Sequence, residues 1–199
     1  MKIIKYLLYL IGGLLVIFFA FGLLNPSVNY GHEIQVNKSA KEAWAVSKDE
    51  SKYAQWLEGF KSIELLSGEQ DAIGSKYKVV VQPAPDQPEF EMTQTIADFK
   101  EFEYATLHFD SDMMDFEQTI SFNEADGKTT IKSDSNVKGK GIMMRSMFAM
   151  METLGGTFTA QEAKNFENLK KLVDENTTDY FPAPVMVEEA VDSTEVVGE

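Results

Sequence analysis

The sequence predicts an α+β domain, made of one antiparallel sheet and a long C-terminal helix, behind an apolar N-terminal helix. Three observations lead to this fold class. A segment without charged residues covers 6–24, apolar and polar residues alternate over much of 60–137, and apolar residues return to helical spacing after 159. A period of two is typical of strands, and spacings of three and four are typical of helices. With 199 residues, of which 44% are hydrophobic, the chain has room for one compact domain and short additions.

The N-terminal segment has the length and composition of a membrane span. It runs YLLYLIGGLLVIFFAFGLL from Tyr6 to Leu24, and at about 1.5 Å per residue it matches a bilayer core of about 30 Å. Lys2 and Lys5 precede it, and the next basic residue is Lys38. The positive-inside rule then predicts a single-pass protein with a cytoplasmic N-terminus and its domain on the outer, periplasmic or extracytoplasmic side. The alternatives are a cleaved signal peptide, although no small-x-small site ends the run, and a buried core helix, although no polar face is visible.

The chain therefore divides into three parts. Residues 1–25 are an anchor or an uncleaved signal, 26–175 are the folded domain, and 176–199 are an acidic tail whose composition is typical of disorder. The net charge of −14 repels phosphate backbones, which excludes nucleic acid as a partner. The absence of cysteine excludes disulfides, thiol nucleophiles and thiolate metal ligands.

A strand and two short helical segments are predicted at the start of the domain. Apolar and polar residues alternate over 30–36, as in a short strand. Ser39 and Glu42 then form a capping box, which predicts a helix start, and Trp44 falls on the inner face of that helix. A second helical segment over 50–56 carries the other tryptophan.

Six further strands are predicted in the middle of the chain. The residues between them are turn-forming, and the Asp-Gly pair in EADGK is a strong hairpin signal. Links this short favour antiparallel pairing, because parallel crossovers need a dozen or more residues. With the first strand they make a seven-stranded curved antiparallel sheet. The six strands are Phe60–Leu66, Lys76–Val81, Phe90–Phe99, Phe102–Phe109, Phe116–Phe122 and Thr129–Val137.

Helical spacing returns at the end of the domain. A methionine-rich stripe covers 142–154, and the pair Gly155-Gly156 predicts a break after it. Thr159 and Glu162 form a second capping box, which predicts the start of the long helix. Its apolar stripe is Ala163, Phe166, Leu169 and Val173.

These pieces, in this order, resemble the START-like or SRPBCC superfamily, in particular its polyketide cyclase/dehydrase and lipid-transport branch. The matching pieces are IQVNKSAKEAWAV with YAQW, GSKYKVVV, EADGKTTIK and FENLKKLVDE, and they extend over about 30–175. The resemblance is carried by their order and spacing. It implies a helix-grip fold, in which the sheet wraps around the long C-terminal helix and encloses a hydrophobic cavity.

Counting by twos along the strands predicts which side chains face that cavity. Gln94 and Gln118 are the amides in these sets, and a buried amide without a partner costs about 1 to 3 kcal/mol. A bond between them, a bound water or an outward orientation are the alternatives. The predicted inward sets are Tyr77, Val79 and Val81; Met92, Gln94 and Ile96; Phe116, Gln118 and Ile120; and Ile131, Ser133 and Ser135.

The candidate ligand-binding residues combine these sets with the helical segments. Trp56 is expected to act as a lid on the cavity, whereas Trp44 is expected to pack in the core. The methionines can line the cavity, fill the core or meet the bilayer near the anchor. The predicted cavity-lining residues are Trp56, Tyr77, Met92, Gln94, Phe116, Gln118, Ser133, Met147, Met151 and Phe158.

Catalytic and metal-binding signals are weak. The chain lacks the G-x-S-x-G, H-E-x-x-H, P-loop and G-x-G-x-x-G patterns, and its two histidines, His32 and His108, lie in predicted strands. An inward-facing His108 could act as a general base. A hairpin carries Asp110, Asp112 and Asp115 without the glycine and terminal glutamate of a calcium loop. No catalytic residue, metal or cofactor is predicted.

Three function classes follow. The favoured one is a membrane-tethered binding module that holds a hydrophobic or lipid-like small molecule, with the membrane contacted through the N-terminal helix. The second is a cyclase-like or hydrolase-type enzyme that acts on a hydrophobic substrate in the same cavity. The third is an envelope scaffold with a collapsed cavity, since a fold does not determine a function.

Overall fold

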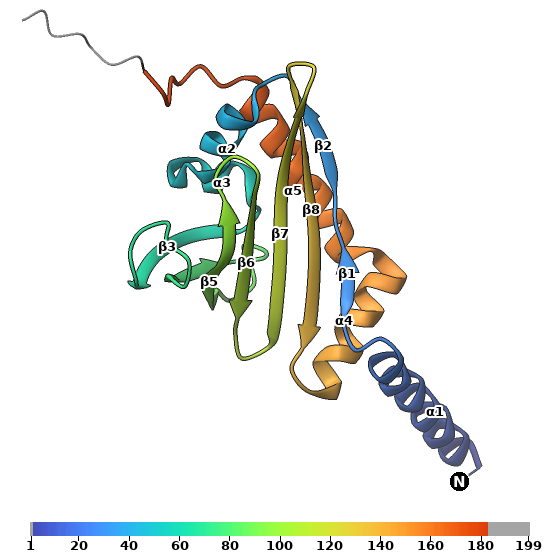
Figure 1. Ribbon diagram of the computed structural model, residues 1–199. Coiled ribbons are helices and arrows are strands. Elements are labelled where there is room, and N and C mark those ends of the chain that lie inside the picture. Colours follow the sequence, from blue (N-terminus) through green and yellow to red (C-terminus); the bar gives the residue numbers. More distant parts are fainter. Residues whose placement is uncertain (1, 183–199) are drawn as a thin grey trace, which may run out of the picture.

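The computed structural model describes residues 2–182 of the chain. Within this range the helices are α1 (Lys2–Leu24), α2 (Ala40–Lys48), α3 (Tyr53–Trp56), α4 (Gly141–Gly155) and α5 (Thr157–Asp174), with a 3-10 turn, η1 (Glu50–Lys52), before α3. The strands are β1 (Val28–Tyr30), β2 (Glu33–Val36), β3 (Phe60–Ser67), β4 (Lys76–Val81), β5 (Phe90–Lys100), β6 (Tyr104–Asp110), β7 (Met114–Ala125) and β8 (Lys128–Gly139). The predicted α+β class and the order of its elements are confirmed (Figure 1).

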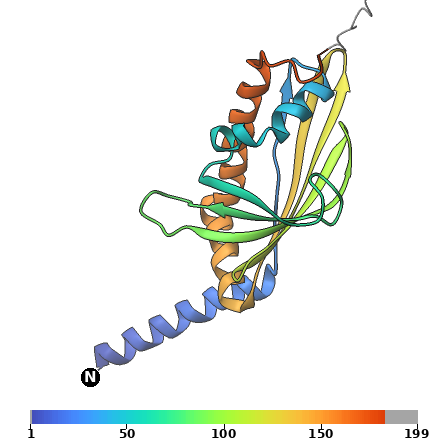
Figure 2. The ribbon, with the colours of Figure 1, turned by 90° about the vertical axis from the view of Figure 1, so that its left-hand side faces the viewer.

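The strands form one curved antiparallel sheet that wraps around α5. Their order is β1-β8-β7-β6-β5-β4-β3, and β2 also pairs with β8. Strands β7 and β8 run the height of the domain beside α5, whereas β3, β4 and β5 bend away and cross below α2 and α3 (Figures 1 and 2). The difference in direction leaves one half of α5 close to the sheet and the other half facing a concave surface.

The described sheet has eight strands where the sequence pattern predicted seven, because the first strand is divided at Gly31 and His32. Here the chain crosses closely over Ser133: a Cβ added at Gly31 would collide with the Ser133 carbonyl oxygen. The Ser133 amide donates to the His32 carbonyl at 2.9 Å, and the His32 amide donates to Ser133 Oγ at 3.0 Å. The break thus keeps both halves paired with β8 while the backbone bends.

The cap and the core position of α2 are as the sequence predicts. The Glu42 amide donates to Ser39 Oγ at 3.2 Å, which satisfies a free amide of the first turn. Trp44 is 6% exposed, and its ring packs against Phe99, Phe102 and Phe122. It therefore belongs to the main hydrophobic core.

The Asp-Gly hairpin joins the two longest strands. Asp126 and Gly127 have φ values of 51° and 71°, the left-handed conformation that a two-residue hairpin turn needs. Pairing runs without interruption from Met114 with Gly139 to Ala125 with Lys128. The strands are longer than predicted because polar residues at both ends keep their backbone pairing.

The break between α4 and α5 lies where the glycine pair predicts it. Gly156 takes the left-handed conformation, with φ of 58°. The second predicted capping box is wrong, however. The first turn of α5 is capped by Glu152 of α4, which accepts from the Phe158 amide at 2.9 Å and also bonds the Thr159 side chain. Because this anionic cap already satisfies the helix start, Glu162 is free to turn inward.

Helix α1 is long and apolar enough to cross a membrane, judged by length and composition, and is the one such helix among residues 2–182. Most of its side chains are exposed, from Lys2 to Ile17. Its last turns, Phe18–Gly22, pack against α4.

The first residues of the predicted tail are packed on the domain. Asn176 is 9% exposed, and its side chain accepts from Lys52 at 3.0 Å. Tyr180 donates to Asp49 at 2.7 Å and packs against the core. The expected disorder therefore does not extend over 176–182, and the remainder of the predicted tail lies outside the described residues.

Candidate functional site

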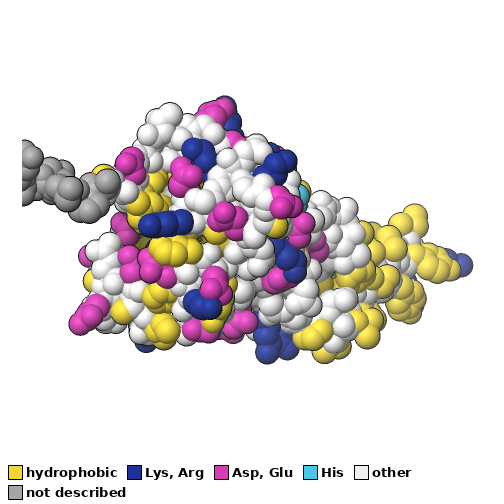
Figure 3. All heavy atoms as spheres, turned by 45° about the horizontal axis from the view of Figure 1, so that its top comes forward, with side chains coloured by type: hydrophobic (Ala, Val, Ile, Leu, Met, Phe, Trp, Pro, Cys, Tyr) yellow, Lys and Arg dark blue, Asp and Glu magenta, His cyan; other side chains and the backbone are white. Residues whose placement is uncertain are grey.

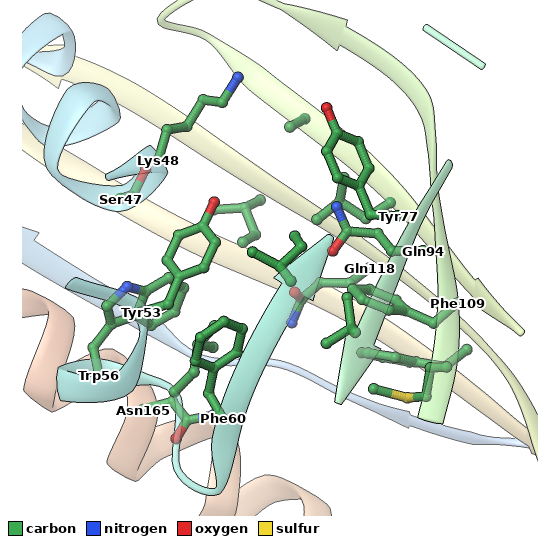
Figure 4. Close-up of a pocket in the computed structure, with 18 of the residues that line it drawn as sticks. Ser47, Lys48, Tyr53, Trp56, Phe60, Tyr77, Gln94, Phe109, Gln118 and Asn165 are labelled. Atoms are coloured by element: carbon green, nitrogen blue, oxygen red, sulfur yellow. The ribbon is translucent and has the colours of Figure 1, made fainter. Parts of the chain in front are cut away.

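A cavity of about 320 Å³ lies between the concave face of the sheet and the N-terminal half of α5. The walls come from β3 to β7, α3 closes one side, and Tyr30 of β1 reaches in from the far edge. Figure 4 shows Trp56, Tyr53 and Phe60 on one side, facing Tyr77, Gln94, Gln118 and Phe109 across the space. The lining is mostly apolar and aromatic, with a few polar groups, as in cavities that bind small molecules.

Most of the residues predicted from the strand period do line this cavity. The inward sets of β4, β5 and β7 all reach it, and the β8 set is buried instead beneath α5. The predicted register is therefore right on all four strands, since a slip of one residue would turn each set outward. The predicted site residues that line the cavity are Trp56, Tyr77, Met92, Gln94, Phe116, Gln118 and Phe158.

Three predicted site residues lie elsewhere. Ser133 is fully buried where β8 pairs with the chain at His32, beyond the cavity wall. Met147 and Met151 are 37% and 38% exposed on the outer face of α4. The break at Gly156 explains the methionines, because it ends α4 before the cavity and leaves the helical wall to α5.

A buried carboxyl, Glu162, forms a polar cluster in the cavity wall. It is 6% exposed and accepts hydrogen bonds from Gln118 Nε2 at 2.8 Å and from Ser135 Oγ at 3.3 Å. Burial raises the pKa of Glu162 above its usual range, although these hydrogen bonds oppose the shift. Gln118 also donates to Ser135 at 3.2 Å, so the amide has partners on two elements.

Tyr30 is the second titratable group beside this cluster. Burial and the nearby Glu162 carboxyl raise the pKa of its phenol. Its ring stacks against Phe158 at 5.5 Å and Phe116 at 6.3 Å, which holds the hydroxyl end near Ser135. Glu162 and Tyr30 therefore place two proton-carrying groups in an otherwise apolar wall.

Trp56 carries a hydrogen-bond donor without a partner. Its side chain is 5% exposed, and Nε1 bonds to no atom among residues 2–182. A buried donor left unpaired costs about 1 to 3 kcal/mol. An acceptor atom on a molecule inside the cavity would remove that cost.

Charged residues surround the cavity on the side of α2 and α3. An ion pair of Lys48 and Asp71 joins α2 to the loop after β3, and Asp71 also donates its amide to the Tyr77 hydroxyl at 2.9 Å. A second pair joins Glu58 to Lys164 of α5, and it lowers the pKa of Glu58. These pairs tie the edges of the cavity to one another.

Sequence reasoning missed Glu162 and Tyr30 as cavity residues. For Glu162 a signal existed: residues 158, 162, 166, 169 and 173 recur at spacings of four and three, which puts them on one helix face. The capping-box pattern at 159–162 competed with that stripe. Tyr30 gave no comparable signal, because a strand break separates it from the alternation that follows.

The histidines and the aspartate cluster do not join the site. His108 lies between Leu107 and Phe109, which face the cavity, so its own side chain points away. His32 lies 3.8 Å from Glu167, at the edge of α5. Asp110 and Asp115 both approach Lys140, and no group of three metal-ligating side chains is found within 2–182.

Several solved structures share this fold. A conserved protein from Geobacillus kaustophilus is 19% identical, with a TM-score of 0.59 over 73% of this chain and 95% of the other. The di-domain ARO/CYC protein BexL of the BE-7585A biosynthetic pathway is 12% identical, with a TM-score of 0.55 over 76% of this chain and 52% of its own. Ara h 8.0201 is 14% identical, with a TM-score of 0.54 over 75% and 99%. The domain thus has the helix-grip fold of the START-like superfamily, as the resemblance implied, while no protein-family model and no curated protein matches the sequence.

Proposed function

We propose that this protein is a membrane-anchored binding protein that holds one hydrophobic or lipid-like small molecule in its cavity. The observation that carries the proposal is an apolar space of about 320 Å³ in a domain whose other half is tightly packed. Cavities of about 300 to 1000 Å³ are typical of small-molecule sites. Residues 26–175 are the binding domain and 1–25 its anchor.

The polar groups of the cavity favour an amphipathic ligand over a pure hydrocarbon. Trp56 Nε1 offers a free donor, and Gln94 offers a donor and an acceptor in the same space. The opposite wall carries the Glu162 cluster. A molecule with an apolar body and one or two oxygen atoms matches this arrangement, because each buried polar atom then gains a partner.

The anchor and the charge pattern support the placement of this domain at a membrane. Lys2 and Lys5 flank the start of α1, which favours a cytoplasmic N-terminus and an outer domain. Ara h 8.0201 and the ARO/CYC proteins share the fold, and a cavity in the same fold supports binding here without naming the ligand.

Photocrosslinking of the full chain tests the binding proposal. The chain is reconstituted in lipid nanodiscs with a fatty acid that carries a diazirine on its alkyl chain, illuminated, and mapped by peptide mass spectrometry. We expect adducts on the inward residues Met92 and Phe116, and we expect excess unmodified fatty acid to remove them while adducts on α1 persist. Adducts confined to α1 and α4 would overturn the proposal for this ligand class.

An acid-base enzyme on a hydrophobic substrate is the second candidate. It is favoured by the position of Glu162, a buried carboxyl with a raised pKa that is held in the cavity wall near Tyr30. Such a group can donate or accept a proton near neutral pH. Glu162→Gln should then abolish turnover of a bound molecule while its occupancy in the cavity stays unchanged. Turnover that survives this change would reject Glu162 as the acid or base.

A further inference from the structure

The outer face of α4 is apolar and uncovered. Met143, Met147, Met151 and Leu154 are spaced by four, four and three, so they form one stripe, and their exposed fractions are 65%, 37%, 38% and 73%. The two charged residues of the helix are engaged elsewhere: Arg145 Nε donates to the Gly139 carbonyl at 3.1 Å, and Glu152 caps α5. The stripe therefore presents thioether and leucine side chains without a charge.

Helix α1 is packed beside this stripe. Gly22 of α1 is buried against Ser146, and a Cβ added there would collide with Ser146 Oγ and lie 2.6 Å from the Ser146 amide nitrogen. The absence of a side chain at Gly22 allows the two backbones to approach closely. Figure 3 shows the hydrophobic side chains of α1 continuing onto the adjoining part of the domain.

The length of α1 determines how deep this contact must lie. At 1.5 Å per residue, the freely exposed part from Lys2 to Ile17 spans about 24 Å, whereas a bilayer core is about 30 Å thick. The hydrocarbon must then also cover the turns Phe18–Gly22, which are the turns that contact α4. A spanning α1 brings α4 to the outer boundary of the same bilayer.

We propose that the outer face of α4, defined by Met143, Met147, Met151 and Leu154, is immersed in the interface of the bilayer that α1 crosses. This inference rests on the proposed membrane anchor. It makes α4 a second membrane contact that fixes the orientation of the domain. The inner face of α4 carries Phe148, whose ring contacts Phe158 of the cavity wall at a centroid distance of 5.4 Å. The bilayer and the cavity would then lie on opposite sides of a single helix.

Spin labelling of the full chain in nanodiscs of phosphatidylcholine and phosphatidylglycerol tests this inference. The chain has no cysteine, so single variants can be labelled without background. Met147→Cys reports the face, Val16→Cys reports α1, and Lys128→Cys, at the exposed turn joining β7 and β8, is the aqueous control. For each label, the collision rates with oxygen and with a water-soluble nickel chelate are measured. We expect the oxygen-to-chelate ratio at Met147 to exceed that at Lys128 several-fold and to approach that at Val16.

The other outcomes separate the two proposals. A lipid-exposed Val16 with a chelate-accessible Met147 would overturn the inference and leave the anchor intact. A chelate-accessible Val16 would overturn the anchor and the inference together. A label at Met147 shielded from both reagents would also overturn the inference, because a protein surface would then cover the face.

Discussion

The two halves of α5 have opposite surroundings, although they belong to one continuous helix. The C-terminal half places Phe166, Leu169 and Val173 against β2, β8 and α2, and all three are at most 1% exposed. The N-terminal half places Phe158 and Glu162 beside a cavity of about 320 Å³. The helix is amphipathic throughout, so the difference lies in the sheet that faces it.

This difference shows how a helix-grip domain can be both stable and hollow. Where the long strands run beside α5, side chains interlock at the density of an ordinary core. Where β3 to β5 bend away, the same helix cannot reach them, and aromatic rings line the gap instead of filling it. Stability and binding should therefore respond to different residues.

The largest expected effect is the loss of a side chain in the packed half. Leu169→Ala should lower the free energy of unfolding by about 2 to 5 kcal/mol, because it opens a void among fully buried neighbours. Leu107→Ala removes the same atoms beside the existing cavity and should cost less than about 2 kcal/mol, since fewer contacts are lost. Urea unfolding of the full chain, followed by the fluorescence of the two buried tryptophans, measures both. Equal losses would show that the two halves are packed alike.

A smaller effect, dependent on pH, is expected from Glu162→Gln in the open half. Burial raises the pKa of Glu162 above the usual value of 4.5, so the folded chain holds this proton to higher pH than the unfolded chain. The contribution of the carboxyl to stability is thus complete below pH 4.5 and is lost as the pH rises through the folded pKa. The glutamine stays neutral, so the variant should match the wild type near pH 4 and exceed its melting temperature at pH 8.

The exposed Glu64→Gln on β3 serves as the matched control for that comparison. Its difference from the wild type should show no comparable rise between the two pH values. A difference at Glu162 that is constant with pH would contradict the assignment of a raised pKa to this carboxyl.

The smallest effect is expected at the edge of the cavity. Lys164→Met breaks the ion pair with Glu58, whose partners are both substantially exposed, so the free energy of unfolding should change by less than about 1 kcal/mol. The same unfolding assay at low and high salt checks this. A loss comparable to that of Leu169→Ala would mean that the ion pair, and not the packed half of α5, holds the helix in place.

The sequence predicted the fold better than it predicted the site. Strand period and turn residues identify which side chains share a face, and so Tyr77, Gln94 and Gln118 were placed correctly. Neither signal reports where the sheet bends or which helix meets the concave face, and so Met147 was assigned to the cavity although it lies on the outer face of α4. The role of Glu162 depended on a competing cap from Glu152, a tertiary contact that local patterns do not show.

The central claim is that the open half of α5 encloses a hydrophobic molecule. Native mass spectrometry of the full chain, purified from its membrane in detergent and released in the gas phase, tests it for a ligand of any identity. Leu107→Trp fills the cavity, and Leu15→Trp makes the same change on the exposed surface of α1. We predict one bound small molecule on the wild type and on Leu15→Trp, and its loss from Leu107→Trp. A wild-type chain without any bound mass, or equal occupancy in all three proteins, would contradict the account.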